Sequence, residues 1–596
     1  MKLKLPYLIQ DPQAGFEVEK TPTFEDEAFC LDGPVSRRVA VLHFDPESGA
    51  LRPGVRFLPG SGGRPGTYDV PDRTRDLTPE ICAGDDFLSV NAFATVLQTL
   101  YMYQEPDALG REIEWAFGAP QLLVVPRAGE WANAFYHRES HSLQFFHFPA
   151  REAAPGRPGT VYTALSQDIL AHETAHAVLD GIAPDLYNCL TPQSLALHEA
   201  VADLTAVLVA VRSRKLVDRL MGETGGSISG LQGFTRLAEQ FGFERDRSGR
   251  SRHLRSLWNE RNLCPDDDSL DEHNRMNRAN RGEPHLLSEV LSGALYRVLA
   301  HLHDVERRKR AEQQGVSEYS ASGFALFVAR KHFQRLVLRS LDYLPPGEVS
   351  FADYGRAILA TDEASFADPS PGRDKLVEEF VRRCIVADAA ELAVDTDYED
   401  PALAAADLDT LVASDWAAYD FAERHRVLFG IPPGERFRVR PRLVANKTYY
   451  VRKDGENGLR PVRELIFKVS WDRVEPNPKH LELSELRQIT VGTTLAVDWE
   501  TKRVRALLRS DASRPTEANP AAARLREDRD LMLTRLAAGR RLHLAGQADE
   551  GAGDAVRVET SGDLMRVRGA GRMLHLADHW QEDETPAAAV TGDGDA

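Results

Sequence analysis

The stretch Leu170-Ala171-His172-Glu173-Thr174-Ala175-His176-Ala177-Val178 places two histidines four residues apart, with a glutamate directly after the first. An α-helix makes one turn in about 3.6 residues, so both imidazoles leave the same face and can bind one metal ion. The pattern suits zinc, with His172 and His176 as ligands and Glu173 as the general base that takes a proton from water. Alone it is a moderate signal, because a helix with two incidental histidines has the same pattern.

A second apolar helix, predicted at 194–213, carries Glu199 and Asp203 one turn apart. Burying two carboxylates without a cation or hydrogen-bond donors costs several kcal/mol, so we expect both carboxylates to bind such a partner. Glu199 as third ligand would complete a His-His-Glu site with one open position, as in catalytic zinc sites. Asp203 is then expected to fix the tautomer of a ligand histidine, the alternative being a buried salt bridge. His198 points about 100° away from Glu199 and is not expected to be a ligand.

The composition argues against two classes of partner. The chain has 596 residues, 42% hydrophobic and 28% charged, with a formal net charge of −18. Such a length exceeds what one hydrophobic core supports, so we expect about three or four domains. Nucleic acids and anionic membranes both require a basic surface, so neither is an expected partner.

The cysteines and the N-terminus indicate an intracellular protein. Five scattered cysteines form no Cys-x-x-Cys pair, so neither a disulfide framework nor a cysteine zinc site is expected. Residues 1–6 lack the apolar run and cleavage site of a signal peptide. The most apolar helix, near 195–211, carries charged side chains and is not expected to span a membrane. We expect a cytoplasmic location, with leaderless export as the open alternative.

Residue patterns divide the chain into five regions. Apolar residues at helical spacing or in alternation supply the signals. Helices are predicted at 90–103, 166–182, 194–213, 285–304 and 320–342, strands at 39–44, 121–125, 142–148 and 436–440, and a hairpin at 492–504. The predicted regions are a β and loop lead-in (1–85), a mixed region (86–386), a linker with a helix (387–432), a β-rich accessory domain (433–510), and a helix followed by a disordered acidic tail (511–596). The expected fold class is α+β.

Over 86–386 the sequence resembles the thermolysin-like (gluzincin) zinc metallopeptidases. The matching segments occur in the family's order: Asn133-Ala134-Phe135-Tyr136, HETAHAVLDGIAPDLY from His172 to Tyr187, Glu199 to Asp203, Leu254-Arg255-Ser256-Leu257, and Pro284-His285. The resemblance implies a zincin-type catalytic core, with an N-terminal sheet part and a mainly helical C-terminal part. It also implies one catalytic Zn²⁺ ion and hydrolysis of peptide bonds.

The resemblance further implies roles for individual residues. Tyr187 and His285 would donate hydrogen bonds to the developing oxyanion. Asn133 and Ala134 would hold the substrate backbone, with strand 142–148 as hairpin partner of their strand. Arg255 would bind the substrate carbonyl after the cleaved bond. Ile169 and Leu254 match pocket positions and predict a hydrophobic residue after the scissile bond, the alternative being that both are core residues.

Two departures from the family pattern leave questions open. The family usually carries an aspartate five residues before the late histidine, where this chain has Asn280; Glu283 is the other candidate to orient His285. No clear calcium-binding loop is present. The acidic residues Asp266, Asp267, Asp268, Asp271 and Glu272 make Ca²⁺ possible but do not support it, since a solvated loop has the same composition.

The expected function is that of a zinc-dependent endopeptidase acting on a peptide or protein substrate. One alternative is a catalytically silent zinc-bearing scaffold that binds a partner through the β-rich domain; another is a zinc amidase acting on non-protein substrates. Glu173 argues against the scaffold, because a structural zinc site needs no base. Four alternating arginines of the β-rich domain could form a surface that contacts anions, or simply a solvated face: Arg436, Arg438, Arg440 and Arg442.

Overall fold

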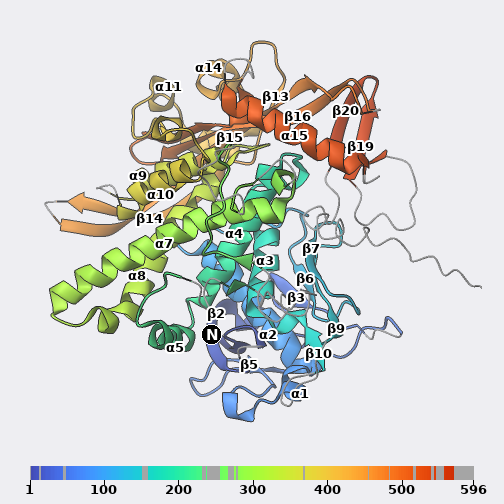
Figure 1. Cartoon of the computed structure of the whole chain (residues 1–596), viewed down its shortest axis with the longest axis vertical. Coiled ribbons are helices and arrows are strands. Elements are labelled where there is room, and N and C mark those ends of the chain that lie inside the picture. The colour runs from blue at the N-terminus through green and yellow to red at the C-terminus, as the bar shows by residue number, and fades with distance from the viewer. Residues whose placement is uncertain are drawn as a thin grey trace, which may run out of the picture.

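The computed structural model in Figure 1 describes most of the chain. The described residues are 2–12, 15–44, 48–150, 159–230, 236–237, 255–265, 274–276, 280–366, 370–453, 456–481, 483–514, 519–538, 542–544 and 556–568. The acidic residues considered for calcium, Asp266–Asp268, Asp271 and Glu272, lie outside these ranges, so the calcium expectation stays open.

A small sheet lies beside a long buried helix in the N-terminal part. Its strand order is β3 (Val39–Val41), β6 (Leu122–Val125), β8 (Ser142–Phe145) and β7 (Ala134–His137), with β7 at one edge. The antiparallel pairing of β7 with β8 confirms the expected hairpin. The predicted strand 142–148 divides after Phe145, and β9 (His147–Pro149) pairs instead with β10 (Thr160–Tyr162). Helix α2 (Asp85–Gln104) packs against β3, and β1 (Lys2–Leu8) pairs with β2 (Val18–Asp26).

The middle of the chain is helical, as its periodicity predicts. Helix α4 (Pro192–Ala210) contacts both α3 (Gln167–Ile182) and α7 (Pro284–Gln314), and α7 packs on α8 (Glu318–Arg339). Apart from His198, Glu199 and Asp203, the sequence of α4 is mostly apolar, and a helix of this kind is stable in a protein interior or a membrane. Among the described residues α4 is the one helix long and apolar enough to cross a membrane, and 94% of its apolar window is buried. It is therefore the central helix of the core.

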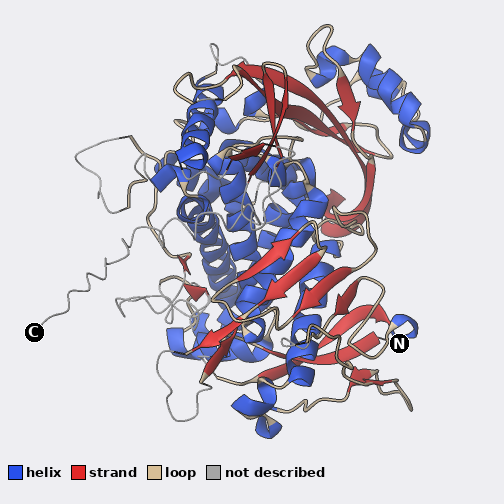
Figure 2. Ribbon diagram, turned by 90° about the vertical axis from the view of Figure 1, so that its right-hand side faces the viewer, coloured by secondary structure: helices blue, strands red, loops and turns tan. Residues whose placement is uncertain are grey.

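The C-terminal part forms an eight-stranded sheet (Figures 1 and 2). Its order is β13 (Phe437–Val439), β15 (Glu456–Pro476), β16 (Leu486–Asp498), β20 (Leu564–Arg568), β19 (Val556–Ser561) and β18 (Leu542–Leu544), with β14 (Leu443–Lys453) on β15 and β17 (Val504–Arg509) on β16. The antiparallel β16–β17 pair confirms the predicted hairpin.

Two regions differ from the sequence prediction. The stretch 387–432 contains four helices rather than one: α11 (Pro401–Ala404), α12 (Leu408–Ala413), α13 (Asp415–Arg424) and α14 (Arg426–Phe429). After the expected helix α15 (Pro520–Ala538), three strands join the sheet where a disordered tail was predicted. One of them, β20, pairs in parallel with β16. Partners this distant in sequence leave no local periodicity, so the pairing could not be predicted.

The large sheet packs on both faces because its side chains alternate. Ile466 and Ala496 belong to the main core with the helices, whereas their neighbours Leu465 and Val497 pack with helices α11–α14 on the other face. Consecutive residues of a strand point to opposite faces, so one strand can serve two cores. Helix α9 (Phe351–Ser365) lies on the inner face, against β14 and β17.

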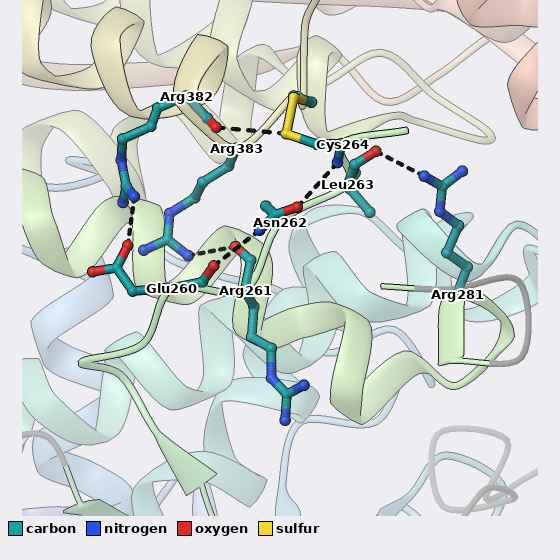
Figure 3. The surroundings of a disulfide bond; sticks show 9 residues. Glu260, Arg261, Asn262, Leu263, Cys264, Arg281, Arg382 and Arg383 are labelled. Atoms are coloured by element: carbon teal, nitrogen blue, oxygen red, sulfur yellow. Dashed lines mark hydrogen bonds and ion pairs between the residues drawn. A yellow bond between two sulfur atoms is a disulfide. The ribbon is translucent and has the colours of Figure 1, made fainter. Parts of the chain in front are cut away.

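The expectation that the cysteines form no disulfide is wrong for one pair. Cys264 is bonded to Cys384, 120 residues away, next to the end of α10 (Pro371–Arg382) (Figure 3). Arg383 lies beside this link and donates hydrogen bonds to the backbone oxygens of Asn259 and Arg261. Only tertiary structure brings these two cysteines together, so their spacing gave no sign of it. Three other cysteines are buried and form no disulfide: Cys30, Cys82 and Cys189.

A buried arginine of helix α15 links this helix to two buried carboxylates elsewhere in the fold. The side chain of Arg529 is 2% exposed and donates to the carboxylates of Glu348 and Glu475. Replacing Arg529 by alanine leaves two buried carboxylates short of a cation. We expect Arg529→Ala to lower the free energy of unfolding by about 3–5 kcal/mol, measured by urea denaturation.

The matched control is Arg524→Ala on the exposed side of the same helix. Its effect should stay within about 0.5 kcal/mol. An equally small effect at Arg529 would show that the buried ion pairs do not stabilise this helix.

Candidate metal centre

Helices α3 and α4 bring the three predicted ligands together. The Nε2 atom of His172 lies 3.1 Å from Nε2 of His176 and 3.3 Å from Oε2 of Glu199. The Nε2 atom of His176 lies 3.5 Å from Oε1 of Glu199. All three side chains are buried, and their ligand atoms lie within 4.8 Å of one another. The group is therefore able to hold a metal ion.

These distances fit a tetrahedral ion. With metal–ligand bonds of 2.0–2.2 Å, neighbouring ligand atoms of a tetrahedral site lie about 3.3 Å apart. The exposure of the side chains shows where the site opens, since those of His176 and Glu199 are 0% exposed and that of His172 is 11% exposed. The accessible side therefore lies next to His172.

The outer ring nitrogens of both histidines have partners of their own. Nδ1 of His172 lies 3.0 Å from Oδ1 of Asp203, one turn beyond Glu199 on α4. Nδ1 of His176 lies 2.9 Å from Nδ1 of His198. When these Nδ1 atoms carry the protons, both Nε2 atoms present lone pairs to each other and to a carboxylate. Three converging acceptors repel one another unless a cation lies between them.

His198 is a site residue that the sequence analysis discarded. Its direction on α4 differs from that of Glu199, as expected, but this places it against the back of His176 rather than away from the site. Burial lowers the pKa of His198 to about 3, so the ring is neutral and its Nδ1 can accept a hydrogen bond from Nδ1 of His176. The signal in the sequence is the position of His198 directly before Glu199. This position suits a contact with a ligand histidine rather than direct ligation of a metal.

The charge of Glu199 is favoured by the surrounding imidazoles. Burial opposes ionisation of this carboxyl, but His285, His176 and His172 outweigh it when their rings are positively charged, and they then hold its pKa well below the usual value. Glu199 is therefore an anion, as a metal ligand must be.

Glu173 lies between the metal ligands and the edge strand. Its buried Oε2 accepts a hydrogen bond of 3.1 Å from the backbone N–H of Tyr136 in β7. Glu173 precedes the turn that carries His176 on the same helix, so the carboxylate is fixed in place beside the ligand histidines. A carboxylate in this position can exchange protons with a molecule bound at the open side.

His285 stands at the rim of the site. Its Nε2 lies 3.5 Å from Oε2 of Glu199, and its Nδ1 lies 3.1 Å from Oε1 of Glu283. Glu283 also caps α7 by accepting hydrogen bonds from the backbone N–H groups of His285 and Leu286. The structure thus assigns the orienting carboxylate to Glu283, whereas Asn280 belongs to a preceding short helix, η6 (Asn280–Gly282).

Tyr187 is buried beside Tyr136 and His198. Its ring packs edge-on against Tyr136 and His198, with centroids 6.1 and 6.5 Å away, and the Arg138 guanidinium lies 4.0 Å from its centroid. Burial raises the pKa of Tyr187 well above its usual value, so its hydroxyl keeps its proton. Asp180 of α3 completes this cluster by accepting hydrogen bonds from Tyr136 and Arg138. Neither Arg138 nor Asp180 was singled out in the sequence.

The strand with the predicted backbone contacts has an open edge among the described residues. The buried Asn133 precedes β7, and its Oδ1 accepts a 2.9 Å hydrogen bond from the N–H of Ala134. On the other edge, β7 pairs with β8. Backbone groups of alternate residues point to the same edge of a strand, so Ala134 and Tyr136 direct theirs away from β8, towards Glu173. An extended peptide can pair with this edge.

The remaining predicted site residues are Ile169, Arg255 and Leu254. Ile169 is half-buried and packs with Phe148 and Val161. Arg255 belongs to β12 (Arg255–Ser256), which pairs with β11 (Arg236–Leu237), and only its backbone position is described. Leu254 lies outside the described residues. The predicted pocket after the scissile bond therefore stays a prediction.

Comparisons with known proteins give little further information. No protein-family model and no curated protein matches the chain. Eight chains of solved structures show a detectable similarity. One is the precursor of protealysin, a metalloproteinase from Serratia proteamaculans, with 16% identity and a TM-score of 0.33, covering 59% of this chain and 88% of that chain. The geometry of the site, rather than this likeness, supports the proposals below.

Removal of the Asp203 carboxylate should weaken metal binding without removing a ligand. Asp203→Ala leaves Nδ1 of His172 without its partner, and loss of such a partner typically costs about 10–100-fold in metal affinity. Competition with a chromophoric chelator measures the change. Asp218→Ala, on the exposed face of α5 (Arg214–Thr224), is the control and should leave the affinity unchanged. Equal affinities would mean that Asp203 does not orient His172.

Proposed function

We propose that this protein is a zinc-dependent endopeptidase. The convergence of His172, His176 and Glu199, with Glu173 next to them, carries the proposal. Two imidazoles and a carboxylate are the donor set of many catalytic zinc sites, and three protein ligands leave one coordination position open. Bound zinc would polarise the scissile carbonyl and lower the pKa of a water molecule.

Glu173 acts as general base. Its carboxylate takes a proton from the attacking water and later delivers a proton to the leaving amine. The hydrogen bond from the N–H of Tyr136 keeps the carboxylate facing the side where a peptide on β7 would lie.

His285 and Tyr187 would stabilise the oxyanion of the tetrahedral intermediate. Glu283 accepts a hydrogen bond from Nδ1 of His285, so Nε2 is directed to the site and is able to donate when the ring is protonated. Tyr187 retains its proton because it is buried, and a phenol with its proton is a donor. Donors fixed before the reaction stabilise developing charge more effectively than mobile water.

The open edge of β7 favours an extended peptide as substrate. The backbone carbonyls of Ala134 and Tyr136 face this edge, while their N–H groups donate to Asn133 and Glu173. Pairing with a strand edge recognises any sequence through its main chain. Zinc amidases acting on compact, non-peptide substrates do not need such an edge. Specificity for a hydrophobic residue after the cut, from Ile169 and Leu254, forms part of this proposal.

Replacing Glu173 by glutamine tests the central claim. Glutamine keeps the shape of the side chain but cannot accept a proton, so we expect cleavage of casein or a fluorogenic peptide to fall by at least about a hundredfold. Zinc content, measured by atomic emission, should stay at one ion per chain. Glu363→Gln, on the exposed side of α9, should retain full activity. Unchanged turnover in the Glu173 variant, or none in either protein, would favour the zinc-bearing scaffold.

His285 should affect the rate rather than substrate binding. His285→Ala removes one donor to the oxyanion, which typically costs about 10²–10³-fold in kcat. Glu283→Gln keeps the helix cap but weakens the orientation of the imidazole, and we expect a smaller loss. Steady-state kinetics on one peptide measure both effects. A large rise in KM with unchanged kcat would contradict the oxyanion role.

A further inference from the structure

Four arginines converge on a pocket beyond the C-terminal end of β7. The pocket has a volume of about 370 Å³, opens to solvent, and is lined by Arg138, Arg438, Arg440 and Arg566 together with Asp185 and Asn188. Arg138 follows β7, whereas the other three come from the large C-terminal sheet, two from β13 and its end and one from β20. The pocket therefore exists only because the sheet lies against the N-terminal part of the molecule.

Three of these arginines have carboxylate partners. Arg138 binds Asp180, Arg438 forms a two-point contact with Asp472 at 2.6 and 2.7 Å, and Arg440 contacts both oxygens of Asp185 at 2.8 Å. Asp185 is the one carboxylate among the lining residues. These ion pairs fix the three guanidinium groups in place.

Arg566 is the exception. Within the part of the chain that the structure describes, it forms no hydrogen bond or ion pair, even with Glu559, its cross-strand neighbour on β19. Four guanidinium groups therefore face three carboxylates, which leaves one positive charge. The five N–H donors of Arg566 are free to bind an anion, and those of Arg440 and Arg438 are only partly used.

The pocket adjoins the proposed substrate edge. Arg138 lies two residues after Tyr136, whose N–H holds Glu173, a distance of about 7 Å along a strand. Close by, Arg557 of β19 forms an ion pair of 2.9 Å with Glu139, in the turn after β7. Figure 1 shows the β19 end of the large sheet above β7. A peptide lying on the β7 edge would bring a side chain into reach of the pocket within a few residues of the scissile bond.

We propose that this pocket binds the carboxylate of an acidic residue in the substrate, so that the enzyme selects peptides with Glu or Asp near the cut. The inference rests on the proposed peptidase function. A carboxylate matches the planar fork of a guanidinium with two parallel hydrogen bonds. One uncompensated positive charge suits one carboxylate, and the net charge of −18 disfavours polyanions.

Peptide binding to an uncleaving protein tests the proposal. The zinc-loaded Glu173→Gln protein is titrated with fluorescent peptides in which glutamate or glutamine is scanned on both sides of a central leucine. We expect glutamate at one position to bind about tenfold more tightly than glutamine, the size typical of a charge-assisted pair that is partly exposed. Adding Arg566→Gln should abolish this difference, and Arg566→Lys should restore part of it.

Arg436→Gln is the matched control, because it removes an exposed arginine that directly precedes β13 and does not line the pocket. The preference for glutamate should survive this change at the same ionic strength. Equal binding of all peptide pairs, or a preference that persists in Arg566→Gln, overturns the proposal. A titration with inorganic phosphate is the second binding measurement. Phosphate binding that depends on Arg566, without any preference among the peptides, would assign the pocket to a free anion instead.

The binding assay requires no cleavage, so the two proposals fail separately. If the unsubstituted protein cleaves no peptide but the glutamate preference remains, the peptidase function is rejected and the pocket is kept. If peptides are cleaved without regard to acidic residues, only the pocket assignment is rejected.

Discussion

The constraint on which the fold depends is electrostatic. The Nε2 atoms of His172 and His176 and the carboxylate of Glu199 face one another at 3.1–3.5 Å in the buried space between α3 and α4. Groups that all present lone pairs repel one another at these distances unless a cation lies among them. Asp203 and His198 contact the Nδ1 atoms of His172 and His176, respectively. These contacts hold both imidazole rings with Nε2 facing Glu199.

A second network couples the metal ligands to the edge strand. Asp180 lies on α3 and accepts hydrogen bonds from Tyr136 and Arg138, both of which extend from the β7 strand and its end. Tyr136 also holds Glu173 through its backbone N–H. The same few contacts therefore position Glu173, the edge of β7 and the arginine pocket. A shift of β7 along α3 would disturb all three, because buried ion pairs tolerate little displacement.

Buried charges also join the large sheet to the helical core. Lys447 of β14 lies between Glu464 of β15 and Asp342, at 3.1 and 3.4 Å, and none of the three side chains is exposed. Arg111 donates to Asp342 from the N-terminal part. Such contacts contribute less to stability than apolar packing would, but they form only when the sheet and the helical core pack in one relative orientation. One consequence is that β13 and β20 are held where their arginines meet Arg138.

The sequence alone determined the helices, the hairpins and the three residues that could hold a metal ion, because helical spacing and apolar patterns depend on residues within one or two turns of each other. The spacing of His172 and His176 fixes a common face, and the apolar run around Glu199 fixes a buried helix. Tertiary structure alone decided what is distant along the chain: the disulfide of Cys264 and Cys384, the strands after α15, and the arginine pocket. These features join segments about a hundred or more residues apart, or lie in stretches without periodicity. Local spacing carries no information about such contacts, since they depend on how whole elements pack.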